Sequence, residues 1–291
     1  MKKICLIGGI NYASIVDSDS FKNENSVPSN IHSRFGGVAY NIAIKLSEYK
    51  DGEITLISVL SNDVLGNLVS NFLSKLGIKY QNSIFVDSWS SYYCHINTKD
   101  GSYGFDDMRC LKKVTPEYIK SIKNVLDDSD IIFIDGNLNE DTISYIANNV
   151  KTPLFFDGTS PEKAIRVKNC FDKIDFVKFN YYEYCRFFIF DPKDEILPEE
   201  IIHHLLDEKI KNKLVVSLGK QGALLFSNSG YSFYKPENII ESKNALRAGD
   251  SFVSGIICGY LNNLTDYEIL VEGTKRSVNV LKQNIKESNY T

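Results

Sequence analysis

The sequence lacks the features that would place a protein in a membrane, on a nucleic acid or around a zinc ion. No apolar run approaches the ~20 residues that a helix needs to cross a bilayer. The six cysteines show no Cys-x-x-Cys spacing, which argues against a zinc site. The net charge of −4 lacks the basic excess typical of nucleic-acid binders. We therefore expect neither a membrane nor a nucleic acid among its partners.

The amino-terminal stretch is also poor in export signals. The apolar run after Lys3 is too short for a signal peptide, no cleavage site follows it, and it is better explained as a first buried strand. We therefore expect a cytoplasmic protein with reduced thiols. The run continues into Gly-Gly-Ile-Asn-Tyr, which lacks the G-x-G-x-x-G spacing of dinucleotide-binding proteins, so a nicotinamide-dependent oxidoreductase is a distant alternative.

The chain has no internal repeat and no low-complexity linker, and 291 residues suit one large domain with or without a small appendage. Short runs that are apolar on both faces alternate with helical patterns, as in a mostly parallel sheet covered by helices. The expected strands are 4–7, 54–59, 131–134, 154–156, 176–178 and 214–218. The expected helices are 38–49, 64–75, 116–125, 141–149, 180–188 and 199–206.

Two segments, about 12–35 and 80–110, break this alternation. Both have extended character with alternating or polar residues, and a Lys-Asp-Gly turn at 99–101 joins two extended pieces. They predict a small β appendage over one end of the sheet. Ligands of an open α/β sheet bind beyond the carboxyl ends of its strands, so such an appendage would be a lid that keeps water out.

The first stretch that could carry chemistry contains Gly36 and Gly37, which end an extended segment and open a helix. Paired glycines allow a ligand to approach the backbone, and the exposed helix amides can donate to it. Asn41 follows one turn into the helix, where its amide can hydrogen-bond a polyol. The structural alternative is an ordinary strand–helix turn with Asn41 in solvent, and the stretch alone favours that alternative.

The second stretch places Asn180 and Glu183 three residues apart at the start of a helix, on one face. An amide and a carboxylate there could hold a hydrated magnesium ion and phosphate oxygens. The same Asn-x-x-Glu spacing is a common helix cap with a capping-box acid. Taken alone, the spacing favours the cap.

The third stretch, Ala248-Gly249-Asp250, opens an apolar, small-residue helix. Backbone amides and the positive end of a helix dipole suit the charge of a transferring phosphoryl group. Asp250 could accept the proton of an attacking hydroxyl, or simply stabilise the first turn of a buried helix. In a fourth stretch, a buried strand ends at Ser217, and Gly219 and Gly222 form a turn that could pass over a nucleotide or be an ordinary β-turn.

The order and spacing of these stretches resemble the ribokinase-like (PfkB) family of carbohydrate and nucleoside kinases. The resemblance covers nearly the whole chain, and the matches to its four motifs are Gly36, Gly37 and Asn41; Asp63 and Gly66; Asn180 and Glu183; and Ala248, Gly249 and Asp250. It implies a three-layer α/β/α sandwich with a mostly parallel central sheet and a small β lid. It also implies one kinase domain over residues 1–291.

The activity that the resemblance implies is transfer of the γ-phosphate of ATP to a sugar or nucleoside hydroxyl. Asp250 would be the base, and the amides of residues 248–250 would form the anion hole next to Arg247. Asn180 and Glu183 would organise Mg²⁺ and ATP. The remaining implied contacts are Ser217, Gly219 and Gly222 at the nucleotide, and Asn11, Gly36, Gly37 and Asn41 at the sugar.

Within the family, three further stretches are most similar to pseudouridine kinases. They are residues 90–108, 133–141 with Asn137, and 155–163 with Asp157 and Lys163. This similarity implies the ribose 5′-hydroxyl of pseudouridine as the acceptor and adds Asn137 to the substrate-binding residues. Homodimerisation through the β lid is also expected by resemblance, whereas a monovalent cation is left open.

The sequence departs from the family pattern at several points. Arg247 stands where the family has glycine, and a glycine takes conformations that arginine takes only with strain. Its guanidinium could instead point at a phosphate. Ala13 replaces an aspartate that grips sugar hydroxyls, and the carboxyl end is short for the nucleotide wall. A degenerate paralogue that binds nucleoside or nucleotide without turnover is therefore the alternative to a working kinase.

Overall fold

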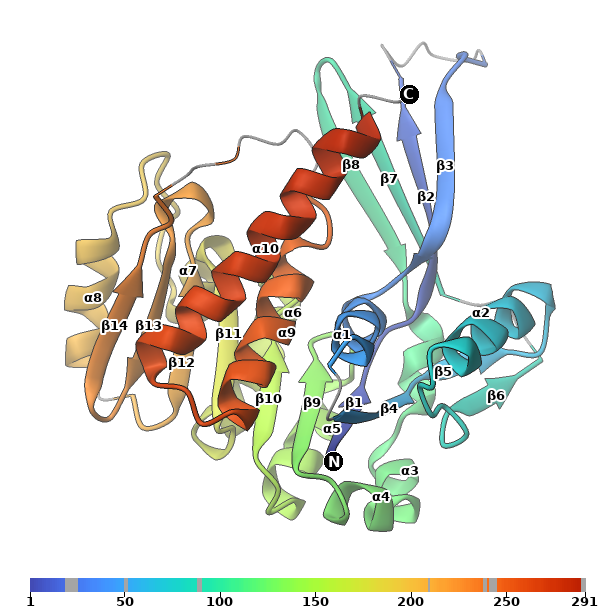
Figure 1. Ribbon diagram of the computed structural model, residues 1–291, viewed down its shortest axis with the longest axis horizontal. Helices are drawn as coiled ribbons and strands as arrows, with labels where there is room; N and C mark the ends of the chain where they lie inside the picture. The colour runs from blue at the N-terminus through green and yellow to red at the C-terminus, as the bar shows by residue number, and fades with distance from the viewer. Residues whose placement is uncertain are drawn as a thin grey trace.

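The computed structural model describes residues 1–18, 26–49, 52–87, 91–208, 210–237, 240 and 245–288. Its centre is an eight-stranded sheet in the order β14-β13-β12-β11-β10-β9-β1-β4 (Figure 1). The six strands from β4 to β12 are parallel, and β13 and β14 complete the edge as an antiparallel hairpin. The strands are β1 Lys2–Ile7, β4 Gly52–Ile57, β9 Ile131–Asp135, β10 Leu154–Asp157, β11 Phe176–Asn180, β12 Lys213–Ser217, β13 Ala223–Ser227 and β14 Gly230–Tyr234.

Successive residues of the central strands point into two different hydrophobic cores, because side chains alternate along a strand. In β9, for example, Ile132 and Ile134 join one core whereas Ile131 and Phe133 join the other, and all four are fully buried. This two-sided burial explains the continuous apolar runs of the sequence. It requires helices on both faces of the sheet and produces the expected three layers.

The helices are divided between the two cores. One face of the sheet carries α1 Val38–Ser47, α2 Val64–Lys75, α9 Ala248–Leu261 and α10 Asp266–Ser288. The other carries α3 Pro116–Ser121, α4 Lys123–Asp127, α5 Glu140–Asn149, α6 Pro161–Ala164, α7 Tyr181–Phe188 and α8 Pro198–Asp207, together with the 3-10 helices η1 Arg109–Lys113 and η2 Ile165–Lys173. A third 3-10 helix, η3 Gly219–Gln221, connects β12 to β13.

Most of the predicted strands and helices are confirmed to within two residues at each end. Two differ in a way that has a local cause. The predicted helix 116–125 divides into α3 and α4, because Ile122 leaves helical backbone geometry with φ −108° and ψ 18°. The predicted strand 54–59 ends at Ile57, and Val59 begins a new strand that leaves the central sheet.

A second, four-stranded sheet stands away from the central one (Figure 1). We call it the small sheet; its order is β3-β2-β7-β8, with β2 Asn11–Asp17, β3 Asn30–Gly36, β7 Tyr92–Thr98 and β8 Gly101–Asp107. Residues 19–25 and 88–90 of the predicted appendage lie outside the described residues. Residues 84–86 form β6 Ile84–Val86, which pairs with β5 Val59–Ser61 in a separate two-stranded sheet.

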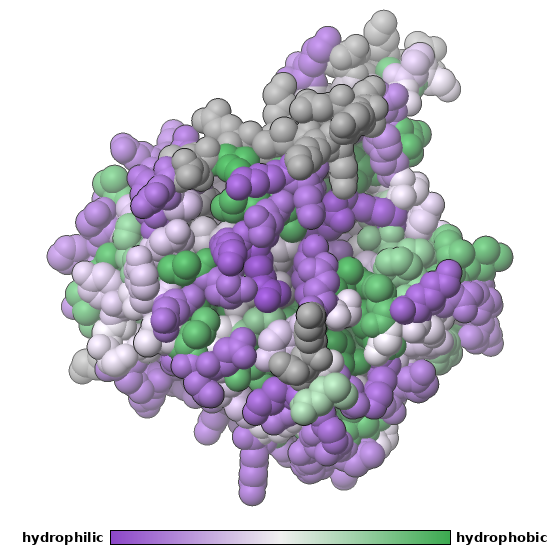
Figure 2. Space-filling view, in the orientation of Figure 1, coloured by the Kyte–Doolittle hydropathy of each residue, from purple (hydrophilic) through white to green (hydrophobic). Residues whose placement is uncertain are grey.

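The surface of the body is mixed in character. Hydrophilic residues gather along the outward face of α10, whereas hydrophobic ones gather over α2, where Val64, Leu68 and Phe72 are exposed (Figure 2). No helix among the described residues is long and apolar enough to span a membrane. All six cysteines are free thiols in the structure, and four of them are buried.

Candidate active site

Three neighbouring strands of the central sheet have charged residues at or near their carboxyl ends. Asp135 is the last residue of β9, Asp157 is the last of β10, and Lys178 lies near the end of β11. Lys178 Nζ is 3.0 Å from Asp157 Oδ2, and the two side chains are only 10% and 4% exposed. A buried ion pair of this kind at the carboxyl edge of an open parallel sheet marks the place where such folds bind ligands.

Asp250 lies in the first turn of α9 at this same edge. Its Oδ2 accepts a hydrogen bond of 2.7 Å from Asn41 Nδ2, which joins two side chains 209 residues apart in the chain. Burial raises the pKa of Asp250 to about 7, with a further rise from Asp157, while the Asn41 hydrogen bond and the charge of Lys178 lower it. A carboxylate with a pKa near neutrality suits a general base.

The amino terminus of α9 forms a positively polarised cradle beside Asp250. The helix has 14 residues, so its first amides carry the positive end of a substantial dipole. Lys178 Nζ adds a full charge there, since it lies 3.8 Å from where a Cβ would stand on Gly249. Arrangements of this kind stabilise the negative charge of a transferring group.

Arg247 precedes this helix in the left-handed conformation, with φ 68° and ψ −5°. Glycine takes this conformation at no steric cost, whereas for other L-residues it is strained. The guanidinium Nη2 donates a hydrogen bond of 3.4 Å to Asn284 Oδ1 on α10. The Asn284 side chain in turn donates to the carbonyl oxygen of Leu246. Arg247 therefore packs the start of α9 against α10.

Asn180 and Glu183 form a complete capping box at the start of α7. Glu183 Oε2 accepts from the backbone amide of Asn180 at 2.8 Å, and Asn180 Oδ1 accepts from the backbone amide of Glu183 at 2.9 Å. The helix-cap alternative of the sequence is thus the geometry observed. Burial raises the pKa of Glu183 to about 7, although the charge of Lys178 opposes the rise. This keeps a titratable carboxyl beside the Lys178–Asp157 pair.

A cavity of about 560 Å³ opens between α9, α10 and the β12–β13 turn. Its lining includes the predicted nucleotide residues Asn180, Ser217, Gly219 and Gly222, and also Ala248 and Gly249 of the predicted anion hole. The sequence left open whether the short carboxyl end leaves a nucleotide wall incomplete or supplies it differently. In the structure, α10 contributes Thr274, Ser277, Val278 and Leu281 to the lining of this cavity.

Asn11 and Gly36 are paired at one end of the small sheet, and Gly37 follows as the N-cap residue of α1. Gly37 has φ 105°, and a Cβ on it would lie 2.2 Å from the carbonyl oxygen of Gly9, so the tight packing needs glycine. A Cβ on Gly36 would lie 2.9 Å from Asn11 Oδ1. That Oδ1 is buried and accepts no hydrogen bond from the described residues. A buried acceptor without a hydrogen bond lowers the stability of a fold by ~1–3 kcal/mol, so a ligand hydroxyl that donates to this oxygen would bind favourably.

Asp135 is a fully buried carboxylate that the sequence reasoning missed. Its Oδ2 accepts from the amides of Gly9 at 2.8 Å and Ala39 at 3.3 Å, and its Oδ1 accepts from the amide of Asn137 at 2.9 Å. Burial raises its pKa, and these hydrogen bonds oppose the rise. The Asn137 side chain, a predicted sugar ligand, accepts at Oδ1 from Lys163 Nζ at 2.8 Å.

A signal for Asp135, Asp157 and Lys178 was present in the sequence. Each is a charged residue at or near the end of a continuous apolar run: "FIDG", "FFDG" and "FVKFN". Since the carboxyl ends of parallel strands share one edge of the sheet, such residues are expected to lie along that edge, and the strand order decides which of them meet.

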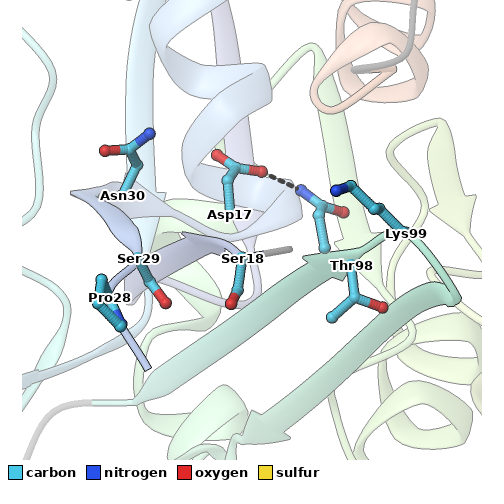
Figure 3. Close-up of a pocket in the computed structure, with 8 residues that line it drawn as sticks. Asp17, Ser18, Pro28, Ser29, Asn30, Thr98 and Lys99 are labelled. Atoms are coloured by element: carbon cyan, nitrogen blue, oxygen red, sulfur yellow. Dashed lines mark hydrogen bonds between the residues drawn. The ribbon is translucent and has the colours of Figure 1, made fainter. Parts of the chain in front are cut away.

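A separate cavity of about 620 Å³ lies at the far end of the small sheet, lined by Asp17, Asn30, Asn97 and Lys99 among others (Figure 3). Asn97 Nδ2 donates to Asp17 Oδ1 at 2.8 Å within it. Asp17 ends β2, whereas Asn11 begins it, so the two sites are about 20 Å apart along the strand. This open, polar hollow is therefore distinct from the site around Asp250.

Known proteins resemble this chain over most of its length. A sequence profile of the pfkB family of carbohydrate kinases matches residues 1–277. The pseudouridine kinase of Escherichia coli is 23% identical over 271 residues, which cover 90% of this chain and 84% of that protein. A carbohydrate kinase structure from Agrobacterium tumefaciens gives a TM-score of 0.78 at 24% identity, covering 95% of this chain and 90% of that one. Ribokinase from Thermotoga maritima gives 0.77 at 19% identity, covering 94% and 91%. The two structures have the same ribokinase-like fold as this chain.

Proposed function

The chain belongs to the pfkB family of carbohydrate kinases, and from this premise we propose that it transfers the γ-phosphoryl group of ATP to the ribose 5′-hydroxyl of pseudouridine. As a member of this family it is a phosphotransferase that acts on hydroxyl groups of sugars or nucleosides. The observation that carries the proposal is Asp250, which lies beside the α9 amides and Lys178 and is held by Asn41.

The chemistry assigned to these residues is a single in-line transfer. Asp250 accepts the proton of the attacking hydroxyl, and the hydroxyl oxygen forms a bond to the γ-phosphorus. The bond from that phosphorus to the β–γ bridging oxygen breaks, and ADP leaves. The amides of residues 248–250 and the Lys178 ammonium stabilise the charge on the transferring oxygens. The proton remains on Asp250 until the product departs.

Magnesium, when bound, would neutralise phosphate charge. The residues of the site fit an ion carried largely by phosphates and water. No group of three His, Cys, Asp or Glu side chains able to hold a metal occurs among the described residues. Glu183 is 1% exposed and bonded to Asn180, so this pair would act on the ion through water, a mode that magnesium commonly uses.

The choice of pseudouridine is supported by the E. coli relative and by the sugar wall. We assign Asn11, Gly36, Gly37, Asn41 and Asn137 to this wall. The orphan Asn11 Oδ1 would accept a ribose hydroxyl, while the glycines let the sugar approach the backbone. ATP would occupy the cavity that Ser217, Gly219 and Gly222 help to line.

We also propose that residues 1–291 act as one kinase domain with the small sheet as its lid, and that the lid forms a homodimer. In the strand register, Tyr12, Tyr92, Phe105 and Tyr103 share one face with Ile31. All but Tyr12 are at least 41% exposed, and Ile31 reaches 63%. An exposed aromatic face of this kind is typical of an interface core.

A binding protein without turnover is the second candidate, favoured by two observations. Arg247 places a strained, bulky residue at the mouth of the anion hole. Ala13, which is buried in β2 between Arg34 and Tyr93 of the neighbouring strands, offers no carboxylate to the sugar. Such a protein would bind pseudouridine or ATP and release no ADP.

The test is ADP release from Mg-ATP across a panel of pseudouridine, uridine, adenosine, ribose and fructose 6-phosphate, each repeated with Asp250→Asn. The proposal predicts turnover with pseudouridine that the substitution abolishes. Turnover with another member of the panel and not with pseudouridine would make that compound the substrate in place of pseudouridine. Absence of turnover together with a rise of the melting temperature on adding pseudouridine or ATP would favour the binding protein.

A further inference from the structure

We propose that Lys163 is a positioning residue that couples the lid to the sugar-binding loops, by pairing with Asp106 of the lid while it holds Asn137 in the body. Lys163 lies on α6, and its Nζ makes both contacts at once. Asp106 lies on β8, so this ion pair joins the small sheet to the body across 57 residues of sequence. The inference rests on the proposed function, since the positioned groups are those that receive the sugar.

On the body side, the contact continues through Asn137 to Asp135. The backbone amide of Asn137 donates to Asp135 Oδ1, and Asp135 Oδ2 accepts from the backbone amides of Gly9 and Ala39. Gly9 lies in the loop that leads to Asn11, and Ala39 lies two residues before Asn41 on α1. One buried carboxylate thus fixes two loops and the first turn of α1, which together present the proposed sugar ligands.

Arg166 makes this region of the body rigid. Its Nη1 donates to the carbonyl oxygens of Gly136 at 2.8 Å, Leu138 at 3.0 Å and Asn137 at 3.3 Å. The loop after β9 is therefore held by Arg166 from one side and by Asp135 from the other. Because this loop is fixed, the lid is the partner that Lys163 can reposition.

On the lid side, the pair forms on the face that looks toward the site. Asp106 pairs with Tyr93 in the register of the small sheet, and Tyr93 pairs with Ala13. Ala13 shares a face of β2 with Asn11, because alternate residues of a strand point the same way. Lys163 is 19% exposed and Asp106 41%, and an ion pair of such exposure is weak enough to open and close with the lid.

The first arm of the test needs no substrate. Amide hydrogen exchange of β7 and β8 is measured in the wild type, Asp106→Asn, Lys163→Met and the double variant, with Lys168→Met as the matched control. Lys168 is an exposed lysine five residues further along, on η2. We expect up to about fivefold faster exchange in each single variant, no further increase in the double variant, and no change in the control. Unchanged exchange, or additive effects of the two substitutions, would overturn the coupling.

The second arm measures kinetics with pseudouridine and Mg-ATP. The KM for pseudouridine should rise up to about fivefold in Asp106→Asn and at least as much in Lys163→Met, which also loses the Asn137 contact. The KM for Mg-ATP should not move. A lower melting temperature with unchanged KM values would make Lys163 merely structural and would refute the proposal. If the wild type does not phosphorylate pseudouridine, the proposed function fails, while the exchange arm still decides the coupling.

Discussion

Replacing Asp250 by asparagine should stabilise the fold and abolish the activity. The gain in stability should grow as the pH rises. The folded protein raises the pKa of this carboxyl from 3.8 to about 7, mainly through burial. Such a shift corresponds to ~4 kcal/mol between the two protonation states, as an upper figure for a half-buried group. Because the folded state binds this proton more tightly than the unfolded chain, the group costs stability as pH rises from about 4 to about 7.

Asp250→Asn removes that cost while the amide oxygen still accepts from Asn41. The difference in unfolding free energy between the variant and the wild type should therefore grow by roughly 2–3 kcal/mol in favour of the variant as the pH rises from 5 to 8. It should also lose turnover at every pH. In the wild type, kcat/KM should fall on the acid side with a midpoint near 7, since the base must be ionised.

The assay is chemical denaturation at several pH values together with a pH–rate profile. Asp141→Asn is the matched control, because Asp141 also lies in the first turn of a helix, α5, but is exposed. The control should change stability equally at pH 5 and pH 8. The reasoning is refuted if Asp250→Asn behaves like the control, or if kcat/KM of the wild type stays level down to pH 5.

Three further substitutions test the packing of the site. Lys178→Met leaves buried Asp157 without its cation, so it should destabilise the fold by about 3–5 kcal/mol. It also removes a charge that lowers the pKa of Asp250, so the acid limb of kcat/KM should move to higher pH, and an unchanged limb would contradict this coupling. Gly37→Ala forces a Cβ to 2.2 Å from a carbonyl oxygen, so chemical denaturation should show that the unfolding free energy falls by several kcal/mol. The loss should be smaller in Gly77→Ala, because Gly77 also has a positive φ, 70°, but a Cβ there would meet no atom within 4 Å. Arg247→Gly should relieve ~1 kcal/mol of left-handed strain and leave kcat within about twofold, whereas a tenfold fall in kcat would show that the guanidinium serves the phosphates.

The layered fold was predictable because burial on both faces leaves a plain mark in the sequence. Strands such as β9 and β12 have continuous apolar runs at their centres, and α2 coincides with its predicted range 64–75. The break at Ile122 was not predictable, since α3 and α4 have one continuous helical pattern and only the backbone at that residue separates them.

The site was predictable in its motifs and not in its contacts. The sequence indicated Asn41 and Asp250 separately, yet their hydrogen bond depends on how α1 and α9 pack on the same face of the sheet. Spacing alone gave Asn180 and Glu183 as either a cap or a magnesium site, and the structure shows the cap geometry. The buried Lys178–Asp157 pair follows from strand order, which local pattern does not encode.

The most direct test of a kinase built around Asp250 is identification of the product formed from pseudouridine and Mg-ATP by ³¹P NMR. The account predicts that the wild type forms a phosphate monoester on the ribose 5′-oxygen together with one equivalent of ADP, and that Asp250→Asn forms neither. A wild type that binds pseudouridine and yields no ester, or an Asp250→Asn variant that yields it at the wild-type rate, would contradict the account.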